Sequence, residues 1–165
     1  MKKIVTITPN PAIDISSTVH QVLAGRKLRC TQASYSAGGG GVNVARVVMR
    51  LGGEPLAIFC MGGDRGNLLK ALLEQEGIPC RVVSTFEPTR ENFSVVEQLS
   101  GGMYRFVMPG PRLSQAEWTA LLDELIAVNP LPDYVVASGS LPAGVPVDFY
   151  ARVAQVVRDR GARLI

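Results

Sequence analysis

Several residue types are scarce in this chain of 165 residues. His20 is the single histidine, which argues against histidine-based catalytic triads and histidine-rich metal sites. Cys30, Cys60 and Cys80 are odd in number and lack the spacing of a metal site, so we expect reduced thiols. From this cysteine usage we infer a cytoplasmic protein.

Long apolar and long basic runs are also missing. No apolar stretch approaches the roughly 18 residues that are needed to span a bilayer. The segment Met1–Ile7 leads into Pro9 and Pro11 before the core of a signal peptide can form, and it is typical of a first strand. The net charge of +3 is spread along the chain. We therefore expect neither a membrane nor a nucleic acid as a partner.

Two common catalytic motifs are absent. The sequence contains no Gly-x-x-x-x-Gly-Lys-Ser/Thr loop, which excludes a P-loop NTPase. It also contains no Gly-x-Ser-x-Gly turn of a serine hydrolase. No carboxylate stands in an evident general-base position. The residues by themselves therefore predict a binding site without a catalytic group, and no metal ligands.

Strand and helix patterns alternate through most of the chain. Strand-like runs at 3–8, 56–61 and 78–84 are separated by helical patterns, and this rhythm predicts a parallel sheet with crossover helices. After residue 113 the rhythm resumes, because Ser114 and Glu117 form a capping-box pattern that predicts the start of another helix. The fold class is thus α/β.

Residues 91–108 interrupt this rhythm. Two apolar runs flank Ser100-Gly101-Gly102, which predicts a β-hairpin. An isolated hairpin is marginally stable in water, so we expect it to join short strands within 14–22 and 29–35 in a small separate sheet. Such a sheet predicts a lid over a pocket, one that could also pack against the lid of a partner.

A run of four glycines, Gly38–Gly41, directly precedes a helical pattern. One apolar stripe of that helix is predicted by the helical spacing of Val44, Val47, Val48 and Leu51. A helix that opens from a glycine run presents free N–H groups to an anionic ligand. A flexible surface turn is the alternative interpretation.

Polar residues follow several of the predicted strands, where ligands bind in open α/β sheets. Asp14 could accept hydrogen bonds from sugar hydroxyls, Asn43 could bind a hydroxyl, and Ser138-Gly139 could approach a ligand closely. A phosphate could be held by a cation, and the candidates are Lys27, Arg29 and Arg90, of which we favour Lys27 and Arg90. The alternatives are turn formation for Asp14 and the serine loop, and solvated surface charges for the cations.

These motifs resemble those of the ribokinase/PfkB family of sugar kinases. The segment Gly39–Ala45, with Gly52 and Gly62 downstream, is similar to the first signature of the family. Thr8–Asp14 and Ser138–Pro142 resemble segments of its sugar-phosphate branch. The resemblance covers essentially the whole chain.

The resemblance implies a ribokinase-like parallel sheet with flanking helices and a small β-sheet lid. Residues 1–165 would be the N-terminal part of one such domain, with lid segments at about 14–35 and 91–108 that also form a homodimer. The implied reaction is transfer of the γ-phosphoryl of ATP to fructose 6-phosphate, with tagatose 6-phosphate and fructose 1-phosphate as alternatives. The residues implied in sugar-phosphate binding are Asp14, Lys27, Gly38, Gly39, Asn43, Arg90, Ser138 and Gly139.

Other family motifs are absent from this sequence. The family carries a Gly-Ala-Gly-Asp segment, whose aspartate is the general base, and an Asn-x-x-Glu stretch connected with Mg²⁺ and the ATP site; neither occurs here. We therefore expect the chain to be the N-terminal half of a kinase and to be inactive alone, with ATP and Mg²⁺ bound mainly by the other half. A non-catalytic binding or dimerisation module is the alternative.

Overall fold

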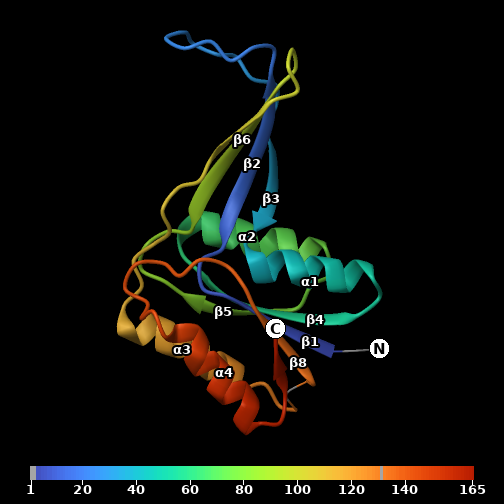
Figure 1. The fold of residues 1–165 in the computed structure, drawn as a ribbon, viewed down its shortest axis with the longest axis vertical. Coiled ribbons are helices and arrows are strands. Elements are labelled where there is room, and N and C mark those ends of the chain that lie inside the picture. Colours follow the sequence, from blue (N-terminus) through green and yellow to red (C-terminus); the bar gives the residue numbers. More distant parts are fainter. Residues whose placement is uncertain (1–2, 131) are drawn as a thin grey trace.

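A computed structural model describes residues 3–130 and 132–165. The described residues form two separate sheets and four helices, as Figure 1 shows. The core sheet has the order β5-β4-β1-β8-β9, and every neighbouring pair in it is parallel. Its strands are β1 (Lys3–Thr8), β4 (Glu54–Met61), β5 (Cys80–Ser84), β8 (Tyr134–Ala137) and β9 (Arg163–Leu164).

Helices cover both faces of the core sheet (Figure 1). On one face lie α1 (Gly40–Arg50) and α2 (Gly63–Gln75), and on the other lie α3 (Gln115–Ile126) and α4 (Phe149–Asp159). Two apolar clusters result, one under each pair of helices. The largest fully buried side chains include Phe59, Leu69 and Leu73 in the first cluster, and Ile7, Leu121 and Phe149 in the second. This arrangement confirms the predicted α/β class.

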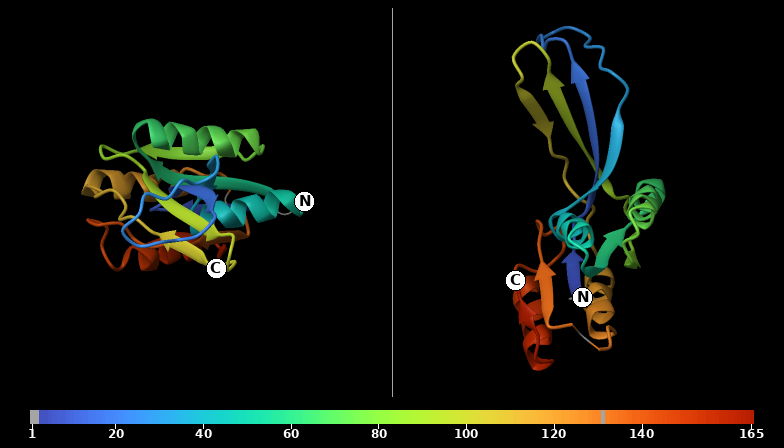
Figure 2. Two further views of the ribbon diagram at one scale, coloured as in Figure 1. Left: turned by 90° about the horizontal axis from the view of Figure 1, so that it is seen from above. Right: turned by 90° about the vertical axis from the view of Figure 1, so that its right-hand side faces the viewer.

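The second sheet has the order β3-β2-β6-β7 and projects from one end of the core (Figure 2, right). Its strands are β2 (Ala12–Val19), β3 (Ser34–Gly38), β6 (Arg90–Glu97) and β7 (Met103–Phe106). β2 pairs with β6 in parallel, and the two outer pairs are antiparallel. The predicted hairpin and the small separate sheet are thus both present; we call this sheet the lid.

Local patterns explain most element boundaries. The Ser114 hydroxyl accepts a hydrogen bond from the Glu117 main-chain amide, and the Glu117 carboxylate accepts one from the Ser114 main-chain amide, so the predicted capping box starts α3. The strand expected within 29–35 instead begins at Ser34 and runs to Gly38. The β2–β3 ladder ends at the pair Ser16 and Ser34, although the Thr31 amide still donates to the Thr18 carbonyl at 2.9 Å.

The predicted apolar stripe of α1 is not its buried face. Val47 is 52% exposed and Leu51 is 82% exposed, whereas the buried residues are Gly41, Val42 and Ala45. Gly41 and Ala45 let α1 lie close over β1 and β4, and Val42 fills the buried face. Periodicity correctly indicated a helix, but it could not identify which face packs on the sheet.

Candidate functional site

The glycine run lies where the lid joins the core sheet, between β3 and α1. Gly39 has a φ of 122°, which a residue with a side chain rarely adopts. The Gly41 amide donates to the Ser138 carbonyl at 3.2 Å, and a Cβ on Gly40 would lie 2.3 Å from Ser138 Oγ. The structure therefore brings the glycine run and the serine loop after β8 into direct contact, and only glycine allows that approach.

Asp14 points toward the same place from β2. Its Oδ1 accepts a hydrogen bond from Asn92 Nδ2 at 2.9 Å, across the β2–β6 ladder. A Cβ on Gly38 would lie 2.3 Å from Asp14 Oδ2, so this carboxylate packs directly against the glycine run. Asp14 is half-buried, and Asn92 fixes one of its oxygens. The remaining lone pairs suit the hydroxyl donors of a sugar.

Arg90 lies at the base of the lid, at the first position of β6. Its Nη1 donates to the Met108 carbonyl at 3.0 Å and its Nη2 donates to the Asn10 carbonyl at 3.1 Å. Its buried Nε has no hydrogen-bond partner among the described residues. Burial lowers the pKa of Arg90, while the negative charge of Asp14 opposes that shift. The guanidinium thus keeps donor capacity for an anion close to Asp14.

Asn43 occupies the first turn of α1, just after the glycine run. Its amide donates to the Gly39 carbonyl at 2.9 Å, and its exposed Oδ1 accepts from Arg46 Nη1 at 3.2 Å. Arg46 is itself held by Glu76, at 2.6 Å, and by the Ala37 carbonyl. The Asn43 side chain is therefore oriented at the N-terminal end of α1, where a ligand in the loop would meet it.

Sequence reasoning assigned no role to three polar residues that the structure places here. Thr8 and Asn10 are almost fully buried at the end of β1, and Asn10 Nδ2 donates to Ser140 Oγ at 3.0 Å. Thr8 Oγ1 and Asn10 Oδ1 have no partner among the described residues. Asn10 could have been found in the sequence as a polar residue just after a predicted strand. Asn92 could have been found because it lies two residues after Arg90, and therefore on the same face of the strand.

Together these groups form a candidate ligand site. It offers a fixed carboxylate for hydroxyls, a guanidinium for an anion, and the main-chain N–H groups of a helix start. Within residues 3–130 and 132–165, no cluster of three or more His, Cys, Asp or Glu side chains is placed to bind a metal ion. The arrangement fits a small, oxygen-rich and anionic molecule.

A family model described as pfkB family carbohydrate kinase matches residues 1–165. The chain belongs to the PfkB family of carbohydrate kinases. It is 48% identical over 163 residues to an ATP-dependent 6-phosphofructokinase isozyme 2 of Mycobacterium tuberculosis, covering 99% of this chain and 48% of that protein. It is 38% identical over 165 residues to the protein of the same name from Escherichia coli K12, covering 100% and 53% of the two chains.

A solved structure gives the same result. The crystal structure of phosphofructokinase-2 from E. coli in complex with fructose-6-phosphate superimposes with a TM-score of 0.94 at 38% identity, over 100% of this chain and 54% of that one. This PfkB chain thus spans about half the length of the relatives that it matches. The fold of the matched half, lid included, is the family fold.

Lys27 is not brought to the site within this PfkB chain. It lies in the exposed connection between β2 and β3, at the end of the lid that is farthest from the core (Figure 1). From Asp14 the strand runs five further residues outward to Val19, a distance of about 17 Å at the usual rise per residue. Ser138, Gly38 and Arg90, by contrast, all lie at the junction of lid and core.

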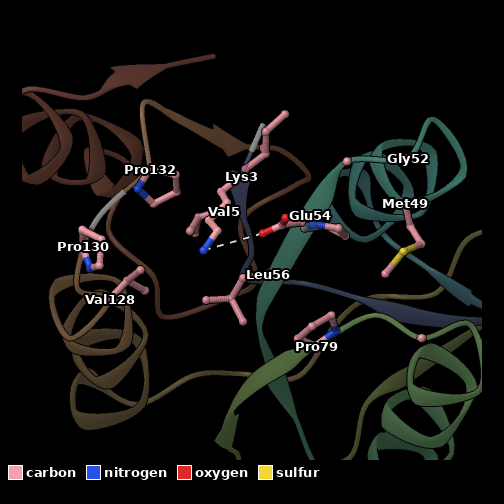
Figure 3. Close-up of a pocket in the computed structure, with 14 residues that line it drawn as sticks. Lys3, Val5, Met49, Gly52, Glu54, Leu56, Pro79, Val128, Pro130 and Pro132 are labelled. Atoms are coloured by element: carbon pink, nitrogen blue, oxygen red, sulfur yellow. Dashed lines mark ion pairs between the residues drawn. The ribbon is translucent and has the colours of Figure 1, made fainter. Parts of the chain in front are cut away.

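A cavity of about 540 Å³ lies at the opposite end of the core sheet, where the strands begin (Figure 3). Its lining is mainly apolar, and its charged side chains are Lys3 and Glu54, which form an ion pair at 3.6 Å. Parallel sheets of this kind bind ligands at the carboxyl ends of their strands. This cavity lacks convergent polar groups, so it is not the candidate site.

No helix among the described residues is long and apolar enough to cross a membrane.

Proposed function

We propose that the full-length protein transfers the γ-phosphoryl group of MgATP to the 1-hydroxyl of fructose 6-phosphate. In this proposal, residues 1–165 supply the sugar-phosphate site and the lid. The observation that carries it is the Asp14 carboxylate, fixed by Asn92 and packed against Gly38. The names of the two relatives, both 6-phosphofructokinases, and the fructose-6-phosphate complex of the E. coli enzyme support the substrate class.

Each residue of the site has a distinct part in this proposal. Asp14 accepts hydrogen bonds from adjacent sugar hydroxyls, while Gly38, Gly39 and Asn43 line the sugar pocket. Arg90 holds the 6-phosphate by two-pronged donation, since a guanidinium matches phosphate oxygens well. Ser138 and Gly139 lie beside the phosphate. Asn10 connects Arg90 to the serine loop, because its carbonyl accepts from Arg90 and its side-chain amide donates to Ser140.

Phosphoryl transfer depends mainly on positioning and on stabilising charge. The described residues position a sugar phosphate but contribute no acidic cluster for Mg²⁺. We therefore expect the general base and the residues that hold ATP and Mg²⁺ to lie in the part of the protein outside this chain. Residues 1–165 alone should have no measurable turnover.

We also propose that the lid forms a homodimer. Its strands are two-faced, because residues that pair across the ladder point to the same side. One face is polar and carries Asp14, Arg90 and Asn92. The other face is apolar, and its outer part is uncovered at Tyr35, Phe93, Tyr104 and Phe106, which are 39–53% exposed. A second copy of the lid is the proposed cover.

The position of Lys27 bears on this dimer. A side chain at the outer end of the lid cannot join the site of its own chain, but a lid packed on a second copy extends toward that copy. If Lys27 contacts the sugar phosphate, it does so in the partner's site.

Steady-state kinetics on the full-length protein test the proposal. We expect kcat/KM for fructose 6-phosphate to exceed the values for tagatose 6-phosphate and fructose 1-phosphate, two substrates that the Thr8–Asp14 segment leaves open. A preference for fructose 1-phosphate would refute the assignment. Absence of ATP-dependent phosphorylation of all three would refute the proposed activity as a whole.

A further inference from the structure

The connection between β2 and β3 spans residues 20–33 and contains no helix or strand. Its middle carries three exposed basic residues, Arg26, Lys27 and Arg29. Its C-terminal end is fixed to β2, because the Thr31 amide donates to the Thr18 carbonyl at 2.9 Å and Ser17 Oγ donates to the Thr31 carbonyl at 2.8 Å. Its N-terminal end, at residues 20–22, is fixed at the tip of the β6–β7 hairpin.

His20 is held by the Leu99 amide at 3.2 Å, and a carboxylate fixes the chain beyond it, at Val22. Glu97 is the last residue of β6, and its Oε1 accepts a hydrogen bond from the Val22 amide at 2.7 Å. Its Oε2 accepts a hydrogen bond from Ser100 Oγ in the β6–β7 turn. Glu97 is only 8% exposed, although carboxylates are rarely buried. One side chain thus connects the N-terminal end of the basic loop, at Val22, to the tip of the hairpin.

Glu97 is not needed to join the hairpin to β2. Main-chain hydrogen bonds already do this, from the Gln98 amide to the Val19 carbonyl at 2.9 Å and from the Leu99 amide to the His20 carbonyl at 3.2 Å. The Glu97 side chain reaches beyond them to Val22. The bonds from Ser100 and Val22 lower the pKa of Glu97, so it stays charged at neutral pH and accepts both.

We propose that Glu97 is a positioning residue of the lid, which fixes the start of the 20–33 loop and thereby the place of Arg26, Lys27 and Arg29. A buried carboxylate is costly unless its oxygens are hydrogen-bonded, and here each oxygen has a partner from a different segment. Between Val22 and Thr31 the loop makes no hydrogen bond or ion pair to the sheet among the residues that the structure describes. The effect on catalysis rests on the proposed function, whereas the effect on loop order does not.

Trypsin supplies a direct test, because it cleaves after lysine and arginine. In the full-length protein, Glu97→Ala should raise the rate of cleavage after Arg26, Lys27 or Arg29 about tenfold, as measured by mass spectrometry of the fragments. Glu97→Gln should restore the parent rate to within about twofold, because an amide can accept from Val22 and donate to Ser100. The matched control is Gln98→Ala, an exposed neighbour whose rate should not change.

A kinetic measurement separates positioning from general loosening. Glu97→Ala should raise KM for the sugar phosphate while kcat and KM for ATP stay within about twofold of the parent. If Glu97→Ala is too unstable to purify, Ser100→Ala removes one of the two bonds and should show the same changes at smaller size. Equal cleavage of Glu97→Ala and the parent would overturn the proposal, and so would a Glu97→Gln variant that behaves like Glu97→Ala. If the parent protein shows no kinase activity, the proposed function is refuted, but the cleavage rates still test whether Glu97 fixes the loop.

Discussion

The core sheet and the lid are stabilised in different ways. The last four residues of β1 are buried, whereas all four residues of β7 are exposed. The core is a parallel sheet covered by helices on both faces, so burial of apolar side chains holds it together. The outer part of the apolar face of the lid is uncovered, and hydrogen bonds that Asn92 and Arg90 donate and Glu97 accepts fix its parts. The candidate site lies at the junction of the two.

The largest expected effect is on the stability of the core. Leu69 lies on the buried face of α2 and is fully buried, so Leu69→Ala should lower the free energy of unfolding by about 2–5 kcal/mol through lost burial and a residual cavity. The matched lid variant is Met103→Ala, which should cost less than about 1 kcal/mol because its side chain is 62% exposed and lies on the lid face opposite Phe106. Urea unfolding of the full-length protein measures both. Equal losses would contradict the contrast between the two regions.

The next effect is on the junction. Asp14→Asn in the full-length protein should lower kcat/KM for the sugar phosphate about a hundredfold, because the charged acceptor of the hydroxyl hydrogen bonds is lost. Asp64→Asn, a carboxylate in the first turn of α2, serves as the control and should change it by less than about twofold. If both variants lose activity equally, Asp14 has no special place in the site.

The proposed use of the apolar lid face predicts a smaller effect on association. Phe106→Glu should weaken the dimer at least about tenfold, because a charge would be buried in an apolar interface. Arg105→Glu changes the charge of the adjacent residue on the opposite face and should leave the dimer intact. Light scattering during size-exclusion chromatography, over a range of concentrations, distinguishes them. An unchanged dimer in Phe106→Glu would place the interface elsewhere.

The smallest effect concerns thiol reactivity, which reports burial in each region. Burial, and next the negative charge of Glu117, raises the pKa of Cys60 to about 12; burial raises that of Cys80 to about 11. Cys30 lies exposed in the lid loop. Thiolates react and thiols do not, so iodoacetamide at pH 8 should label Cys30 first. Labelling of Cys60 at the same rate in folded protein would show that the core opens readily.

The sequence was most informative where structure is local. The Ser114 capping box, the hairpin around Gly101 and the alternation of strands and helices were all predicted, because each depends on neighbouring residues. The apolar stripe of α1 does not mark its buried face, because packing against the sheet, and not the helix alone, selects Gly41, Val42 and Ala45 there.

In the candidate site, too, general rules predicted some features, whereas contacts between residues far apart in the sequence were not predicted. The approach of Gly40 to Ser138 followed from the rule that ligand loops gather at the carboxyl ends of strands. The bonds from Asn92 to Asp14 and from Arg90 to Asn10 join residues about 80 positions apart, so no local pattern reveals them. The distance of Lys27 from the site was not predictable either, because it depends on how far an irregular loop extends.

Arg90 has a consequence for how the lid can move. Four chain crossings connect lid and core, and this side chain starts from one of them and donates to carbonyls on two others, at Asn10 and Met108. Rotation of the lid about this junction must therefore shift the guanidinium or break its bonds. Any change in the angle of the lid therefore also changes the location of this positive charge.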